Sequence, residues 1–282
     1  MGKFILKLKK LKKISLVLLL PNLLWASINV ENTPIPGGIA VVDFESNHSS
    51  PKAFYNQLPL YTQHIKGNHW QALLGIPLKQ KLGMQTIRVT DFSTRTFNIE
   101  VKANKYKEQY ITLKGKKKKY VNPNLKHMDR IKKERPILAQ ARRVFSKEIL
   151  PDGSFIRPVS GVITSPFGLK RFYNEQPRRP HTGLDYAGDI GTPIIAPANG
   201  KVILTGGYFF NGNAVFLDHG QGLISVYIHM NNIAVKQGQM VKQGETIGTI
   251  GQTGRATGPH LHWGVYLNQT VINPNLLLSI NQ

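Results

Sequence analysis

The sequence contains no cysteine among its 282 residues. This absence excludes disulfide bonds, iron–sulfur clusters, thiolate zinc sites, a cysteine nucleophile and a bacterial lipoprotein anchor. Any metal bound by the chain must therefore be held by histidine, aspartate or glutamate. Acidic residues are also scarce, with 15 Asp and Glu against 37 Lys and Arg, so the formal net charge is +22. With 41% hydrophobic and 18% charged residues, the chain is neither wholly disordered nor a protein of many membrane spans.

The positive charge is concentrated in one segment. Residues 102–147 contain 16 basic and 3 acidic residues, whereas residues 151–282 contain 9 and 6. Such a segment attracts polyanions of any kind. It is either a solvated linker face or a patch that docks on an anionic envelope polymer or a membrane surface. Nucleic acid is not an expected partner, because the segment has few interleaved aromatic residues and the chain is expected to be exported.

The length predicts two domains, and the amino terminus predicts export. Residues 1–26 combine a basic start with an apolar stretch of 12 residues, which is short of the ~20 that a membrane-spanning helix needs. We interpret residues 1–26 as a signal peptide, with an uncleaved anchor as the alternative. Export places the protein in the periplasm or elsewhere in the cell envelope.

The remaining chain is expected to be all-β. Residues 27–120 predict an amino-terminal β-sandwich, because short β-branched segments at 39–42, 69–74, 85–89 and 96–101 alternate with Gly/Pro turns. Residues 121–150 predict a basic helical connector, with helical spacing over 125–148 and a break at Pro136. Residues 151–282 predict an antiparallel β domain, with strands at 201–204, 214–217 and 223–227 joined by glycine-rich turns.

Three histidine motifs in residues 151–282 carry the candidate chemistry. His181 and Asp185 lie in Pro-His-Thr-Gly-Leu-Asp-Tyr, His229 in Tyr-Ile-His-Met, and His260 and His262 in Gly-Pro-His-Leu-His-Trp. Alternate strand residues share a face, so His260 and His262 point the same way. His181, Asp185 and one member of that pair make a two-histidine, one-carboxylate set that holds zinc with one position open to water. The two spare imidazoles are then available for proton transfer and oxyanion stabilisation.

Single residues of these motifs, and the other histidines, also allow purely structural interpretations. Taken alone, His181 with Asp185 fits a turn hydrogen bond, and His229 fits a packed strand. His219 is expected to be structural, whereas His127 is expected at the surface and His48, His64 and His69 at the surface or in packing. Residues 173–175, together with Arg178 and Arg179, precede the first candidate ligand on a loop beside the groove, where they are candidates for substrate contact.

These motifs, in this order and with Gly-Gln-Thr-Gly at 251–254, resemble those of the lysostaphin-type zinc metallopeptidases, which cut peptide cross-links in bacterial peptidoglycan. The resemblance covers roughly residues 155–275. It implies that His181, Asp185 and His262 bind Zn²⁺ in an open groove of antiparallel strands. It further implies that His229 and His260 flank the attacking water and the scissile carbonyl, one as general base and the other stabilising the oxyanion. The sandwich is similar to amino-terminal domains of some Gram-negative members.

We therefore expect an exported zinc endopeptidase that acts on peptidoglycan, whose amino-terminal domain positions it on the wall or covers its groove until activation. The alternative is a non-catalytic envelope module of the same fold that binds peptidoglycan or activates a cell-wall amidase. The intact set of five site residues argues against this alternative. A third possibility is a secreted peptidase directed against competing bacteria.

Overall fold

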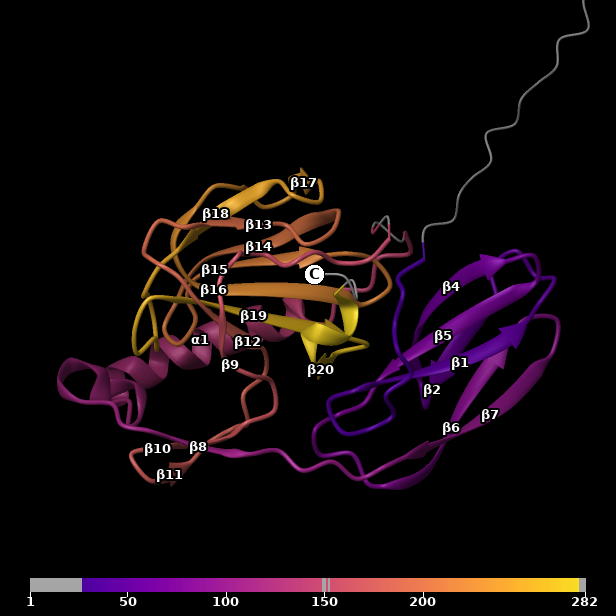
Figure 1. The fold of residues 1–282 in the computed structure, drawn as a ribbon, viewed down its shortest axis with the longest axis horizontal. Coiled ribbons are helices and arrows are strands. Elements are labelled where there is room, and N and C mark those ends of the chain that lie inside the picture. The colour runs from indigo at the N-terminus through magenta and orange to yellow at the C-terminus, as the bar shows by residue number, and fades with distance from the viewer. Residues whose placement is uncertain (1–26, 149–150, 152, 279–282) are drawn as a thin grey trace, which may run out of the picture.

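The computed structural model describes residues 27–148, 151 and 153–278. Two β-rich units lie side by side, with a helix along one of them (Figure 1). Strands dominate, which confirms the all-β prediction. The predicted signal peptide, residues 1–26, lies outside the described residues. Within the described part of the chain, no helix is both long and apolar enough to cross a bilayer.

The amino-terminal unit is a sandwich of two antiparallel sheets. One sheet has the order β1 (Ile39–Glu45), β5 (His69–Gly75), β4 (Tyr61–Lys66), and the other has the order β3 (Leu58–Pro59), β2 (Lys52–Tyr55), β6 (Gly83–Thr90), β7 (Thr94–Val101). Alternate side chains of the facing strands fill the space between the sheets, including Val42, Phe44, Trp70, Ile87 and Val89. This inward alternation is what holds a sandwich together.

The carboxy-terminal unit is built on a ten-stranded antiparallel sheet. Its main path runs β17 (Met240–Val241), β14 (Gly200–Tyr208), β15 (Gly212–Asp218), β16 (Leu223–Ile233), β19 (His260–Leu267), β12 (Leu184–Ala187), β9 (Ile163–Ser165). Three further strands lie off this path. β18 (Thr246–Ile250) pairs with β13 (Pro193–Ile195) and with β16, and β20 (Thr270–Ile272) pairs with β19. The short helix η2 (Pro274–Leu277) follows β20.

The two faces of this sheet differ in chemistry. Along β19, Leu261, Trp263 and Val265 belong to the main hydrophobic core. His260, His262 and Tyr266 alternate with them and line a cavity on the opposite face. The strand alternation thus separates a packing face from a face that is open for chemistry. We call the second face the groove face.

The connector lies against the groove face. It consists of β8 (Glu108–Ile111), the 3₁₀ helix η1 (Gly115–Tyr120) and α1 (Leu125–Ala141). The predicted break at Pro136 does not occur, because α1 continues through Pro136, although it ends at Ala141 rather than near residue 148. Leu138 and Ala141 pack against Phe216 and Val226 of the sheet. This packing outweighs the one backbone hydrogen bond that proline removes.

In the structure, the strands of the sandwich end before the predicted domain boundary at residue 120. The last strand that pairs within the sandwich is β7, which ends at Val101. β8 instead pairs in parallel with β10 (Lys170–Tyr173), beside β11 (Gln176–Pro177) of the carboxy-terminal unit. β8 is four residues long and mostly polar, so its sequence carries little strand signal.

The sandwich contacts the carboxy-terminal unit away from the groove face. Tyr61 and Leu73 join the same core as Val265. The backbone N–H of Gly75 donates to the side chain of Asn268 at 3.3 Å, just beyond β19. None of the described residues 27–101 lines the cavity on the groove face.

Candidate metal centre

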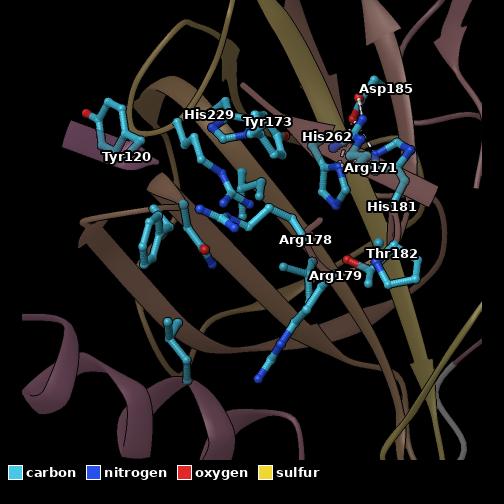
Figure 2. A pocket seen from close by; sticks show the side chains of 18 of the residues that line it. Tyr120, Arg171, Tyr173, Arg178, Arg179, His181, Thr182, Asp185, His229 and His262 are labelled. Carbon is cyan, nitrogen blue, oxygen red and sulfur yellow. Dashed lines mark hydrogen bonds and ion pairs between the residues drawn. The ribbon is translucent and has the colours of Figure 1, made fainter. Parts of the chain in front are cut away.

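Strand pairing brings three candidate ligands together. Asp185 on β12 stands directly opposite His262 on β19 in the antiparallel register. His181 lies four residues before Asp185, in the segment that leads into β12. The ligand atoms of His181, Asp185 and His262 all lie within 4.8 Å of one another, and all three residues are buried. Figure 2 shows these side chains pointing at one another on the cavity wall.

The distances within this triad are short. Oδ1 of Asp185 lies 2.9 Å from Nε2 of His181 and 2.7 Å from Nδ1 of His262. The two imidazole nitrogens are 2.9 Å apart. Two nitrogens and a carboxylate oxygen converging on one point, next to a cavity, form a donor set that suits zinc with a fourth position left open. The residues present therefore fit the metal that the sequence motifs imply.

Backbone contacts orient the triad. Nδ1 of His181 lies 2.7 Å from the carbonyl oxygen of Pro166. A carbonyl can only accept, so Nδ1 carries the proton and Nε2 keeps its lone pair for a ligand. At Gly183, a Cβ would lie 2.3 Å from the carbonyl oxygen of Trp263 and 2.8 Å from Nε2 of His262. Glycine at this position is what lets the His181–Asp185 segment approach β19.

Arg171 supports the second oxygen of Asp185. Its Nη2 lies 2.7 Å from Oδ2, and its Nε donates to Oε1 of Gln109 on β8 at 2.9 Å. Burial raises the pKa of Asp185, but the close contacts of its carboxylate with the His181 and His262 rings lower it by more, so the pKa lies well below its usual range. The carboxylate therefore stays ionised, as a metal ligand must.

His229 and His260 lie beside the triad. Their ring centroids are 4.9 Å apart, and the centroid of His229 is 6.3 Å from that of His262. Nδ1 of His229 lies 2.8 Å from the carbonyl oxygen of Thr253, and Nδ1 of His260 lies 2.9 Å from that of Gly258. By the same reasoning, each neutral ring carries its proton on Nδ1 and presents a lone pair at Nε2. Nε2 of His260 lies 3.9 Å from Oδ1 of Asp185.

Burial and the neighbouring histidines keep His229 neutral. Burial lowers the pKa of His229 well below its usual value, and the charges of His260 and His262 act in the same direction. The backbone at His229 is also unusual, with a φ of 68°. Non-glycine residues with such a φ are uncommon and cluster at functional sites. The bulge region near the end of β16 thus places this imidazole on the groove face.

All five site residues line one cavity of about 560 Å³, which also receives side chains from the connector. Ile131, Glu134 and Leu138 of α1 form part of its wall, opposite Phe216 and Ile228 of the sheet. Connector and sheet are linked by polar contacts as well. Glu134 accepts a hydrogen bond from the backbone N–H of Phe209 at 2.7 Å, and Lys117 donates to the carbonyl oxygen of Ala256 at 2.6 Å.

The other histidines lie apart from the triad. His219 is fully buried, with Nδ1 2.7 Å from the carbonyl oxygen of Asn199 and Nε2 2.7 Å from the hydroxyl of Ser225. The His127 ring lies against that of Phe209 in a tilted arrangement, with the ring centroids 4.8 Å apart. His48, His64 and His69 lie in the sandwich.

Of the residues predicted to flank the groove, Tyr173, Arg178 and Arg179 line the cavity. Sequence reasoning missed Arg171, Gln109, Gly183 and Arg255. Only Gly183 had a readable signal, because it lies between two candidate ligands where a close backbone approach was to be expected.

Two family descriptions match the chain. Residues 179–274 match Peptidase family M23, and residues 32–104 match the Peptidase family M23 N-terminal domain. The crystal structure of a putative peptidase M23 from Pseudomonas aeruginosa is 40% identical, covers 88% of this chain and 96% of that chain, and gives a TM-score of 0.73. The chain belongs to peptidase family M23. This membership confirms the resemblance seen in the histidine motifs and in the amino-terminal domain.

Curated relatives of this M23 chain match over its carboxy-terminal part. Peptidoglycan DD-endopeptidase ShyC of Vibrio cholerae is 42% identical over 122 residues, which are 40% of this chain and 28% of that protein. DD-carboxypeptidase/endopeptidase Mpg of Neisseria meningitidis is 42% identical over 112 residues, which are 40% of this chain and 26% of that protein. The match thus spans about a quarter of the length of these relatives.

Proposed function

We propose that this M23 chain is an exported zinc endopeptidase that hydrolyses peptide cross-links of bacterial peptidoglycan. The main support is the convergence of His181, Asp185 and His262 on one point beside a cavity that also receives His229 and His260. The similarity to the peptidoglycan DD-endopeptidase ShyC supports this substrate class, and the similarity to Mpg supports an endopeptidase. All five positions are retained, which favours catalysis over a binding module. The predicted signal peptide and the substrate together favour the periplasm or the envelope.

The proposed chemistry assigns separate tasks to the two groups of residues. A zinc ion held by His181, Asp185 and His262 would act as a Lewis acid and lower the pKa of water to about 7. His229 and His260 present Nε2 lone pairs toward the same place. One of these atoms takes the proton of the attacking water and returns it to the leaving amine nitrogen, as the C–N bond breaks. The other ring, when protonated, donates a hydrogen bond to the developing oxyanion.

Digestion of defined cross-linked muropeptides, followed by mass spectrometry of the fragments, tests this function. We expect the full chain to convert peptide-cross-linked dimers into monomers, and the His229→Ala and His260→Ala variants to lose ~10²-fold or more in rate. A Lys201→Gln variant, altered at an exposed residue of β14 that does not line the cavity, serves as the matched control. Full activity of both histidine variants would overturn the assignment of their roles.

We further propose that the connector, rather than the sandwich, restrains the enzyme. Helix α1 packs on the groove face through Leu138 and Ala141, and its polar contacts reach Phe209. A peptidoglycan strand that enters the groove must displace this helix. The sandwich contacts the other side of the sheet, so its role in restraint would be to hold the start of the connector. From the sequence we expect the amino-terminal domain to position the enzyme on the wall or to cover the groove, and this proposal assigns the covering role to residues 108–141 instead.

The basic segment supports a second partner class. The outer surface of this segment is formed by exposed lysines of η1 and α1 and by the lysine just before η1: Lys114, Lys116, Lys118, Lys119, Lys126, Lys132 and Lys133. We propose that this surface docks on anionic polymers of the envelope. Because the lysines belong to the connector, docking would also favour its displacement from the groove face. Binding to such a polymer should weaken steeply between low and physiological salt, because the contacts are electrostatic and exposed.

A further inference from the structure

Arg255 is an arginine of the cavity wall without an acidic partner. Its guanidinium carbon lies 4.8 Å from the ring centroid of Tyr173 and 5.1 Å from that of Phe210. Among the described residues, no carboxylate lies within ion-pair distance of this guanidinium, and no oxygen accepts a hydrogen bond from it. The two rings hold the group in place by cation–π contact, and its N–H donors point at no acceptor among the described residues.

A second arginine on the same cavity has only neutral partners. The guanidinium of Arg178 donates to the carbonyl oxygens of Pro177 at 3.0 Å and Val121 at 3.2 Å, and to the side chain of Gln176. The charge of Arg178 is therefore not compensated. Figure 2 shows its side chain extending into the cavity.

The arginines repel one another in this cavity. Burial lowers the pKa of Arg255, and the like charges of Arg171 and Arg178 lower it further against the effect of Tyr173. Arg171 is already paired with Asp185. A bound anion would relieve the repulsion between Arg178 and Arg255, which no described acidic residue does.

Arg178 and Arg255 lie close in sequence to the proposed site residues. Arg178 lies three residues before His181, and Arg255 lies five residues before His260. Both line the cavity that contains the triad. A group bound between them would therefore lie in the same cavity as the metal ligands.

We propose that Arg178 and Arg255 form a subsite for a free carboxylate of the cross-linked stem peptide. This inference rests on the proposed function. A stem peptide bears a free α-carboxylate where a glutamate is joined through its γ-carboxyl group, and a diaminodicarboxylic acid that cross-links through one amine keeps the carboxylate beside that amine. Guanidinium groups bind a carboxylate through paired, charge-assisted N–H···O bonds, which are strengthened by partial burial. The subsite would reject a carboxamide, which lacks the charge and turns N–H groups toward the arginine donors.

Two soluble muropeptide dimers test the subsite, one with free carboxylates and one with the same carboxylates converted to amides. We expect the full chain to cleave the free form with a kcat/KM at least about tenfold higher, the worth of one charge-assisted hydrogen bond. Arg255→Gln should cleave both dimers at the rate of the amidated form, and Arg255→Lys should restore only part of the preference. Arg178→Gln should also lose the preference. Arg143→Gln, an exposed arginine beyond α1, should keep it.

The ratio of kcat/KM for the free dimer to kcat/KM for the amidated dimer is the decisive quantity. Any loosening of the connector by Arg178→Gln changes both values alike and leaves this ratio unchanged. Calorimetric titration of the metal-depleted full chain with the same dimers measures the subsite without hydrolysis. The Kd of Arg255→Gln should rise at least about tenfold for the free dimer and stay unchanged for the amidated one. Equal losses on both dimers would overturn the subsite. If the zinc-loaded chain cleaves neither dimer but the binding preference is present, the proposed function fails while the subsite stands.

Discussion

Asp185 and His262 face each other across the β12–β19 ladder, with Oδ1 of Asp185 2.7 Å from Nδ1 of His262. The other carboxylate oxygen is held 2.7 Å from Arg171. The carboxylate thus turns one oxygen toward the imidazoles and is fixed by the other. The geometry of the triad depends on the register of two strands as well as on the identity of its residues.

The close approach of the His181–Asp185 segment to β19 predicts that Gly183→Ala strongly weakens zinc binding. The new Cβ would lie 2.3 Å from a backbone oxygen and 2.8 Å from His262, so the ligand segment must move away. We expect a loss of zinc affinity of about tenfold to a hundredfold, as for other disturbances around metal ligands.

Competition with a chromophoric chelator measures that affinity directly. The matched control is Gly207→Ala on β14, where a Cβ meets only the side-chain oxygen of Asn213, at 3.2 Å. If Gly183→Ala binds zinc as tightly as this control, the close approach does not contribute to the site.

The packing of α1 on the groove face predicts that Leu138→Asp activates the enzyme. A charge at this half-buried position costs free energy only while the helix lies against Phe216 and Ile228, so the open form gains population. We expect muropeptide hydrolysis to rise about tenfold, because a destabilisation of about 1.4 kcal/mol shifts an equilibrium by that factor.

The neighbouring residue supplies the control for that experiment. Ile137 is 46% exposed, so Ile137→Asp adds the same charge to the same helix turn without facing the sheet. Its rate should equal that of the unaltered chain. Equal rates of all three proteins would show that the connector does not limit access to the groove.

Much of the architecture follows from the sequence, and the limits have physical causes. The His-x-His spacing places His260 and His262 on one face because strands alternate. No spacing indicates that Asp185 pairs with His262, since that contact depends on a long-range register. No spacing indicates that Arg171 pairs with Asp185 or that Arg255 lies against Tyr173, because both contacts depend on tertiary packing. The apolar spacing of Leu138 and Ala141 predicts a helix with one buried face, but it does not identify the surface that this face covers.

The burial of His219 predicts a contribution to the pH dependence of stability. Burial lowers its pKa to about 4, below the value of 6.5 for an exposed histidine. The unfolded chain therefore binds more protons between these values, and the contribution is fully present above pH 6.5 and is lost as the pH falls toward 4. The difference in unfolding free energy between the unaltered chain and His219→Gln should shrink by about 3 kcal/mol over this range. Denaturant titrations at several pH values measure it, and a constant difference would contradict the account.

The most direct test of the central claim is a zinc titration of the metal-depleted full chain, followed by hydrolysis of a cross-linked muropeptide at each point. We predict that activity rises in proportion to bound zinc and saturates at about one ion per chain. Asp185→Ala should neither bind zinc tightly nor gain activity. Full hydrolysis by the metal-depleted chain, or tight stoichiometric zinc binding by Asp185→Ala, would contradict the assignment of the triad as the catalytic metal centre.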